Sequence, residues 1–130
     1  MKDKFQELIE LIEKSLEKDP WLKERNLEEH KKELLSEAKE VVMAIDKKDY
    51  TNLKEELGDL LYDVLIASFI AQRDGFFKKE EILQEIIDKI KRRKPFLFWN
   101  KQISKEEALR IWFKRKKQEK EELEKFKNKR

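Results

Sequence analysis

The chain has 130 residues, of which 47% are charged and 38% hydrophobic, and it contains no cysteine. This length suits one domain with a core of its own, and the lack of cysteine excludes disulfides and thiolate chemistry. With only two glycines and two prolines, the composition favours helix almost everywhere. We therefore expect an all-α fold.

Hydrophobic residues recur at helical spacing in a series of segments separated by helix-breaking signals. Pro20 ends the first pattern, because the residue before a proline resists the α conformation. Asn26 and Ser104 each open a helix as part of a capping box. Gly75 and Pro95 end two further patterns. The predicted helices cover about residues 5–18, 26–48, 52–75, 79–94 and 104–113, with loops at residues 19–26 and 96–100. The third of these has the broadest apolar face, so we expect it to be the most buried.

The net charge of +3 is unevenly distributed, because residues 114–130 carry nine basic and four acidic side chains. A basic helical tail can bind nucleic acid or another polyanion, but the isolated Phe126 offers no stacking platform. We expect a solvated, partly frayed helix here and no nucleic-acid partner. No apolar run is long enough for a membrane span or a signal peptide. The sequence therefore predicts a soluble cytoplasmic protein that does not bind a membrane.

Two pairs of carboxylates carry the strongest chemical signal. Glu37 and Glu40 lie three residues apart in one predicted helix, and Glu56 and Asp59 repeat that spacing in the next. Residues i and i+3 share a helix face, so two antiparallel helices joined by the short segment KKDYTN can bring the pairs together. A hard divalent cation removes most of the cost of burying such carboxylates. The pairs predict an acidic metal cage, and the alternative is a solvated charged face.

Two smaller features bear on this site. Gly58 lies between Glu56 and Asp59, and a glycine inside a helix costs about 1 kcal/mol relative to alanine. Its position predicts that something approaches the backbone closely, either another helix or a ligand. His30 has no Cys or His at metal-binding spacing, so we expect it on a helix surface.

The order of these motifs resembles the MazG family of nucleoside triphosphate pyrophosphohydrolases from Phe5 to about Lys120. The family's acidic signature, Glu-Glu-x-x-Glu followed by Glu-x-x-Asp, is matched by residues 36–40 and 56–59. Further matches are Pro20 with Trp21, residues 44–46, Gly75 with Phe77, residues 88–93 with Pro95 and Phe98, and Trp112. The resemblance implies a MazG-like four-helix bundle with an additional C-terminal helix and charged tail. Residues 1–113 would form the domain and residues 114–130 the tail.

The resemblance also implies an activity: Mg²⁺-dependent hydrolysis of a nucleoside triphosphate between the α and β phosphates, with Mn²⁺ as a possible substitute. It would clear surplus or damaged nucleotides from the pool. The implied metal ligands and catalytic residues are Glu37, Glu40, Glu56 and Asp59. The implied substrate ligands are Lys89, with Lys54, Arg92 and Arg93 as helpers on the phosphates, and Trp112 against the nucleotide. From the residues alone, a solvated helix end for Lys89, Arg92 and Arg93 and a core position for Trp112 remain open.

The family pattern is not matched everywhere. Ser36 replaces the first glutamate of the signature, and Asp63 is an extra acid that could compensate. Leu22 and Leu27 stand where the family often has an acid and a histidine, and Lys-Pro-Phe at residues 94–96 replaces His-Pro-His. Substrate preference therefore does not transfer. A non-catalytic helical module that binds nucleotides or nucleic acid is the alternative function.

An assembly is also expected. Several aromatic residues exceed what one small bundle can hide, and a large exposed apolar patch usually marks an interface. They are Phe69, Phe76, Phe77, Phe96, Phe98 and Trp99. Members of the family typically pair helical protomers. Both arguments predict a homodimer or a larger homo-oligomer.

Overall fold

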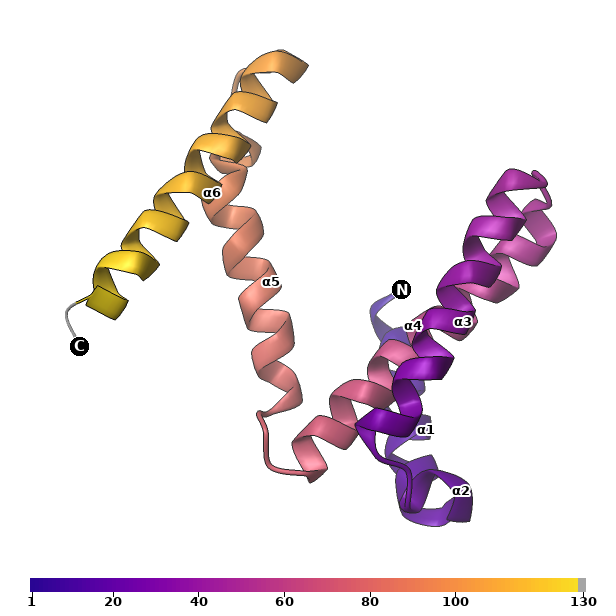
Figure 1. The fold of residues 1–130 in the computed structure, drawn as a ribbon. Coiled ribbons are helices and arrows are strands. Elements are labelled where there is room, and N and C mark those ends of the chain that lie inside the picture. The colour runs from indigo at the N-terminus through magenta and orange to yellow at the C-terminus, as the bar shows by residue number, and fades with distance from the viewer. Residues whose placement is uncertain (129–130) are drawn as a thin grey trace. The chain divides into compact units, whose positions relative to one another are not determined.

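The computed structural model describes residues 1–128, and within them it contains helices and no strand (Figure 1). The all-α fold class predicted from the sequence is confirmed. The helices are α1 Lys2–Lys18, α2 Pro20–Lys23, α3 Leu27–Asp46, α4 Tyr50–Arg73, α5 Lys79–Arg93, the 3-10 helix η1 Pro95–Phe98, and α6 Lys105–Asn128. In this part of the chain no helix has both the length and the apolar character needed to cross a membrane.

The chain divides into two compact units, Met1–Lys79 and Glu80–Arg130, and each is described by itself. The first contains α1 to α4. The second contains η1, α6 and nearly all of α5. The division into a domain of residues 1–113 and a tail of residues 114–130 stays a prediction, and α6 continues without a break through that boundary.

The N-cap bond of each predicted capping box is present, and Gly75 ends α4 as predicted. The Asn26 side chain accepts a hydrogen bond from the backbone N–H of Glu29 at 2.8 Å, and Ser104 Oγ accepts one from Glu107 N–H at 3.1 Å. Gly75 has a φ of 81°, in the left-handed region that glycine adopts without strain. Its N–H donates to the Gln72 carbonyl, and the N–H of residue 76 donates to that of residue 71, which is a Schellman ending for α4.

The segment predicted as a loop at residues 19–26 contains the short helix α2 instead. Asp19 ends α1, and its side chain accepts a hydrogen bond from the Trp21 backbone N–H at 2.9 Å. Pro20 follows as the first residue of α2, a position where its missing N–H and fixed φ cost nothing. Pro95 likewise begins η1, which continues into the second predicted loop at residues 96–100. A proline that stops one helix has therefore started the next.

The hydrophobic core of the first unit joins α1, α2 and α4. Its buried members are Ile12, Leu22, Ile66, Phe69 and Ile70. Burying an aliphatic or aromatic side chain of this size contributes about 1.5–3 kcal/mol. The expectation that α4 is the most buried helix is confirmed, whereas the expectation that Phe69 lies on the surface is wrong, because it is 6% exposed.

The helices α3 and α4 run side by side as an antiparallel hairpin (Figure 1). All core residues of α4 lie after residue 65, so the core covers the C-terminal half of α4. The N-terminal half of α4 carries Glu56 and Asp59 and leaves Leu57 and Leu61 exposed. The predicted acidic pairs thus lie beyond the main core, where they are only partly shielded from water.

Candidate metal centre

Three of the four predicted metal ligands come together between α3 and α4. Oxygen atoms of Glu37, Glu56 and Asp59 all lie within 4.8 Å of one another. Glu37 and Glu56 are half-buried and Asp59 is exposed. Glu40 is exposed and belongs to neither acidic group found in the described residues. The hairpin therefore brings carboxylates from both helices together. The assignment of Glu40 as the fourth ligand stays a prediction.

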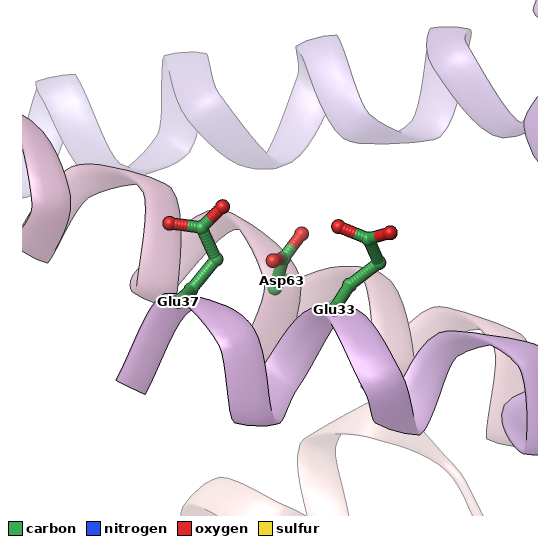
Figure 2. Close-up of side chains that lie close together, drawn as sticks. All are labelled: Glu33, Glu37 and Asp63. Carbon is green, nitrogen blue, oxygen red and sulfur yellow. The ribbon is translucent and has the colours of Figure 1, made fainter. Parts of the chain in front are cut away.

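A second acidic group shares Glu37. Oxygens of Glu33, Glu37 and Asp63 also lie within 4.8 Å of one another, and Figure 2 shows Glu33 and Glu37 on α3 with Asp63 on α4 between them. Asp63 is the extra acid one turn after Asp59 that the sequence predicts could compensate for Ser36. Glu33 was not predicted, although it lies one turn before Glu37 on the same helix face.

Glu37 is the carboxylate that the two groups share. Its Oε2 atom is buried and has no hydrogen-bond partner. Burial raises the pKa of Glu37, and the neighbouring carboxylates of Asp59 and Glu56 raise this pKa further. Burial likewise raises the pKa of Asp63. A buried carboxylate oxygen without a donor, surrounded by other carboxylates, fits a hard divalent cation with oxygen ligands.

Lys54 is the predicted phosphate helper on α4, and its side chain is exposed. A Cβ atom added to Gly58 would meet nothing within 4 Å, so the explanation of Gly58 by a tight helix crossing is wrong for the described chain. Room for a ligand beside Gly58 stays a prediction.

The expectation that His30 lies on a helix surface is wrong, because the residue is only 1% exposed. Its Nδ1 accepts a hydrogen bond from Arg25 Nε at 3.0 Å, and its Nε2 lies 2.8 Å from the Asp63 carbonyl oxygen. Since arginine can only donate, Nε2 carries the proton and donates to Asp63. The missed signal is its spacing of seven residues from Glu37, which places both on one face of α3.

Two of the predicted phosphate ligands of the second unit, Arg92 and Arg93, bind a glutamate. Arg92 Nε donates to Glu119 Oε1 at 2.7 Å, and Arg93 Nη2 donates to Oε2 at 2.8 Å. The guanidinium of Arg93 lies 4.9 Å from the Trp112 ring centroid, and the Lys94 ammonium lies 5.6 Å from it. The hydrogen bonds from Arg93 and Arg92 lower the pKa of Glu119 to about 2. Arg92, Arg93 and Trp112 therefore gather within this unit.

Comparison with known proteins identifies the family. Residues 25–98 match the MazG nucleotide pyrophosphohydrolase domain. A crystal structure of a MazG-related protein from Thermotoga maritima is 46% identical, covers 86% of this chain and 98% of that chain, and superimposes with a TM-score of 0.81. The chain therefore belongs to the MazG family, and the resemblance found in its sequence is confirmed.

Longer relatives are similar over part of their length. The nucleoside triphosphate pyrophosphohydrolase/pyrophosphatase MazG of Thermotoga maritima is 36% identical over 96 residues, which is 72% of this chain and 38% of that protein. The nucleoside triphosphate pyrophosphohydrolase of Escherichia coli K12 is 39% identical over 79 residues, 61% of this chain and 30% of that protein. The chain thus spans less than half the length of these curated relatives.

We predict that Glu37→Gln raises the thermal unfolding midpoint at pH 8 in the presence of a chelator. The fold raises the pKa of Glu37 above the ordinary 4.5, so it favours the protonated form. The stability that comes with the protonated Glu37 carboxyl is present below pH 4.5 and is lost as the pH rises through the folded-state pKa of Glu37. The uncharged amide avoids that loss, and its advantage should shrink toward pH 4.5. Circular dichroism measures both midpoints, with Glu55→Gln on the exposed surface of α4 as control. A lower midpoint for Glu37→Gln would contradict the assignment.

We predict that Glu119→Gln lowers the free energy of unfolding by about 1 kcal/mol at pH 7, since charge-assisted hydrogen bonds are partly screened beside the half-exposed Arg92. The pKa of Glu119 is lowered from 4.5 to about 2. Its contribution is therefore fully present above pH 4.5 and is lost as the pH falls through about 2. Urea unfolding followed by tryptophan fluorescence tests this, with the exposed Glu122→Gln as control. Equal stability of the two variants at pH 7 would refute it.

Proposed function

We propose that this chain is a Mg²⁺-dependent nucleoside triphosphate pyrophosphohydrolase that releases a nucleoside monophosphate and pyrophosphate. The observation that carries the proposal is the buried, unpartnered Oε2 of Glu37, in a residue that also groups with Glu56 and Asp59. Membership in the MazG family supports the same chemistry. Clearing unwanted nucleotides from the pool is the role we propose for it.

In this proposal Glu37, Glu56 and Asp59 hold the magnesium, and Glu40 is the fourth ligand by its place in the family signature. When bound, magnesium neutralises phosphate oxygens and lowers the pKa of a coordinated water; Mn²⁺ is a possible substitute. Ser36 leaves the signature one carboxylate short. Glu33 and Asp63 return negative charge beside Glu37, and we propose that they compensate for Ser36.

We propose that basic residues supply the remaining charge on the phosphates. Lys89 and Lys54 are proposed to contact phosphate oxygens directly. Arg92 and Arg93 already bind the two oxygens of Glu119, and a phosphate group offers oxygens of the same kind to the same donors. We propose that the triphosphate displaces Glu119 there and that the nucleotide base packs on Trp112. Fixed positive charge around the phosphates is the main means of catalysis in such reactions.

Turnover can be tested with a mixed pool of ribo- and deoxyribonucleoside triphosphates and Mg²⁺. Asp59→Asn should lower the formation of monophosphate and pyrophosphate by at least about 100-fold, because it removes a charged metal ligand, and should leave the helical circular dichroism unchanged. Glu55→Gln, at an exposed neighbouring position, should keep full activity.

Full activity of Asp59→Asn would refute the metal assignment. Nucleotide binding by the wild type without turnover would support the second candidate, a non-catalytic module that binds nucleotides or nucleic acid. Ser36 is the residue that favours this candidate, because it removes a carboxylate from the family's acidic signature.

We also propose that the protein assembles as a homodimer. Apolar side chains on the hairpin of α3 and α4 remain between 42% and 59% exposed, namely Leu35, Val42, Leu57, Leu61 and Val64. Their spacings of three, four and seven residues place them on one stripe of each helix. A second copy related by a two-fold axis would cover the same stripe on both chains. Phe76 and Phe77 of the first unit, and Phe98 and Trp99 of the second, are also exposed.

Light scattering after size exclusion at micromolar concentration should give twice the 16.0 kDa of the single chain. Replacing Leu57 and Leu61 together by lysine should halve that mass, because charged ammonium groups are costly to bury in an apolar interface. Glu55→Lys adds charge outside the stripe and serves as the control. A wild-type mass near that of one chain would rule out the dimer.

A further inference from the structure

His30 makes a hydrogen bond that links α3 to α4. The Nε2–H of His30 donates to the carbonyl oxygen of Asp63 at 2.8 Å. The imidazole is 1% exposed, so water does not compete for this bond. Farther along α3, Val41 and Ala44 are buried apolar side chains, and apolar packing has no preferred direction. The bond of His30 is therefore a directional contact between the two helices.

This bond lies on the same line of contact as the metal ligands. His30 precedes Glu37 by seven residues, two turns along α3, and Asp63 follows Asp59 by four residues, one turn along α4. Residues at these spacings share a helix face. Figure 2 shows Asp63 opposite the stretch of α3 between Glu33 and Glu37. The bond is thus made one to two turns from the carboxylates that would hold the metal.

The metal site is sensitive to the register of the two helices. Glu37 comes from α3, Glu56 and Asp59 come from α4, and their oxygens lie within 4.8 Å of one another. A slip of one turn moves a helix by about 5.4 Å, which is enough to separate them. A hydrogen bond of 2.8 Å weakens well before such a slip is complete. Holding this bond therefore keeps the three carboxylates together.

The orientation of the His30 ring is itself fixed by Arg25. Arg25 Nε donates to His30 Nδ1 at 3.0 Å, and Arg25 Nη2 donates to the Glu29 carbonyl at 3.3 Å. The Arg25 guanidinium lies 4.0 Å from the Trp21 ring centroid and the residue is 7% exposed. Because Arg25 supplies only donors, the ring keeps the tautomer whose Nε2–H points to α4. Arg73 on α4 donates to the Arg25 carbonyl and holds this loop from the other side.

We propose that His30, oriented by Arg25, is a positioning residue that sets the register of α3 against α4 and thereby the metal affinity of Glu37, Glu56 and Asp59. The proposal rests on the metal site of the proposed function. A register-setting role for His30 differs from that of an ordinary core histidine. Loss of a core residue lowers stability, whereas loss of a register-setting bond lowers metal affinity in protein that is still folded.

The test is calorimetric titration of the folded, nucleotide-free protein with Mg²⁺ or Mn²⁺ alone. His30→Leu fills similar space but makes neither hydrogen bond, and it should weaken metal binding by at least about tenfold. His30→Gln offers an oxygen to Arg25 and an N–H to Asp63, and it should recover the affinity to within about threefold of the wild type. Metal binding by His30→Leu within twofold of the wild type overturns the proposal.

Two further variants separate register from stability. Leu22→Ala removes a core side chain that is 1% exposed, and it should lower the unfolding temperature without changing metal affinity. Should His30→Leu fail to fold, Arg25→Lys decides, because it keeps the charge and removes the Nε donor to His30. Unchanged metal affinity in Arg25→Lys, or an equal loss in Leu22→Ala, overturns the proposal. These titrations contain no nucleotide and therefore measure metal binding alone. A wild type that binds metal here but shows no turnover in the activity assay refutes the proposed hydrolase activity and not the role of His30.

Discussion

The arrangement of the first unit depends on the cost of placing several carboxylates between two helices. Two unit charges about 4 Å apart repel by about 4 kcal/mol at the effective dielectric constant typical of protein surfaces. A small protein has only about 5–15 kcal/mol of net stability. Glu37 has an oxygen with no donor, so hydrogen bonds to that oxygen do not reduce the repulsion. A proton or a cation can reduce the repulsion between the carboxylates. The pair α3 and α4 therefore responds both to protonation and to cation binding.

The position of the core makes this cost tolerable. Ile66, Phe69 and Ile70 of α4 pack with Ile12 of α1 and Leu22 of α2, all away from Glu56 and Asp59. Arg73 strengthens the same end, since it donates to the backbone carbonyls of Leu22 and Lys23. The unit is therefore stabilised at one end of the hairpin and carries its charged site along the other. This division separates the residues that maintain the fold from those proposed to bind the metal.

The sequence predicted what depends on neighbours along the chain. Asn26, Ser104 and Gly75 act within four residues of themselves, and their caps were correctly placed. The convergence of Glu37 with Asp59 also followed, because a short connection forces α3 and α4 to be antiparallel. His30 was misjudged because its partner, Asp63, lies 33 residues away. The partner of Arg92 and Arg93 was missed for the same reason, since Glu119 comes from the segment predicted to be a solvated tail.

The second unit differs from the first in a way that bears on ligand affinity. None of its described residues, 80–128, is buried, so its helices gain little from apolar packing within the chain. Segments with few buried contacts open locally at a lower free energy than a core helix such as α4. A ligand that orders such a segment loses part of its interaction energy to that ordering. The nucleotide binding proposed for Lys89, Arg92 and Arg93 would then be weaker than the number of cations suggests, and the proposed pyrophosphate product would leave correspondingly faster.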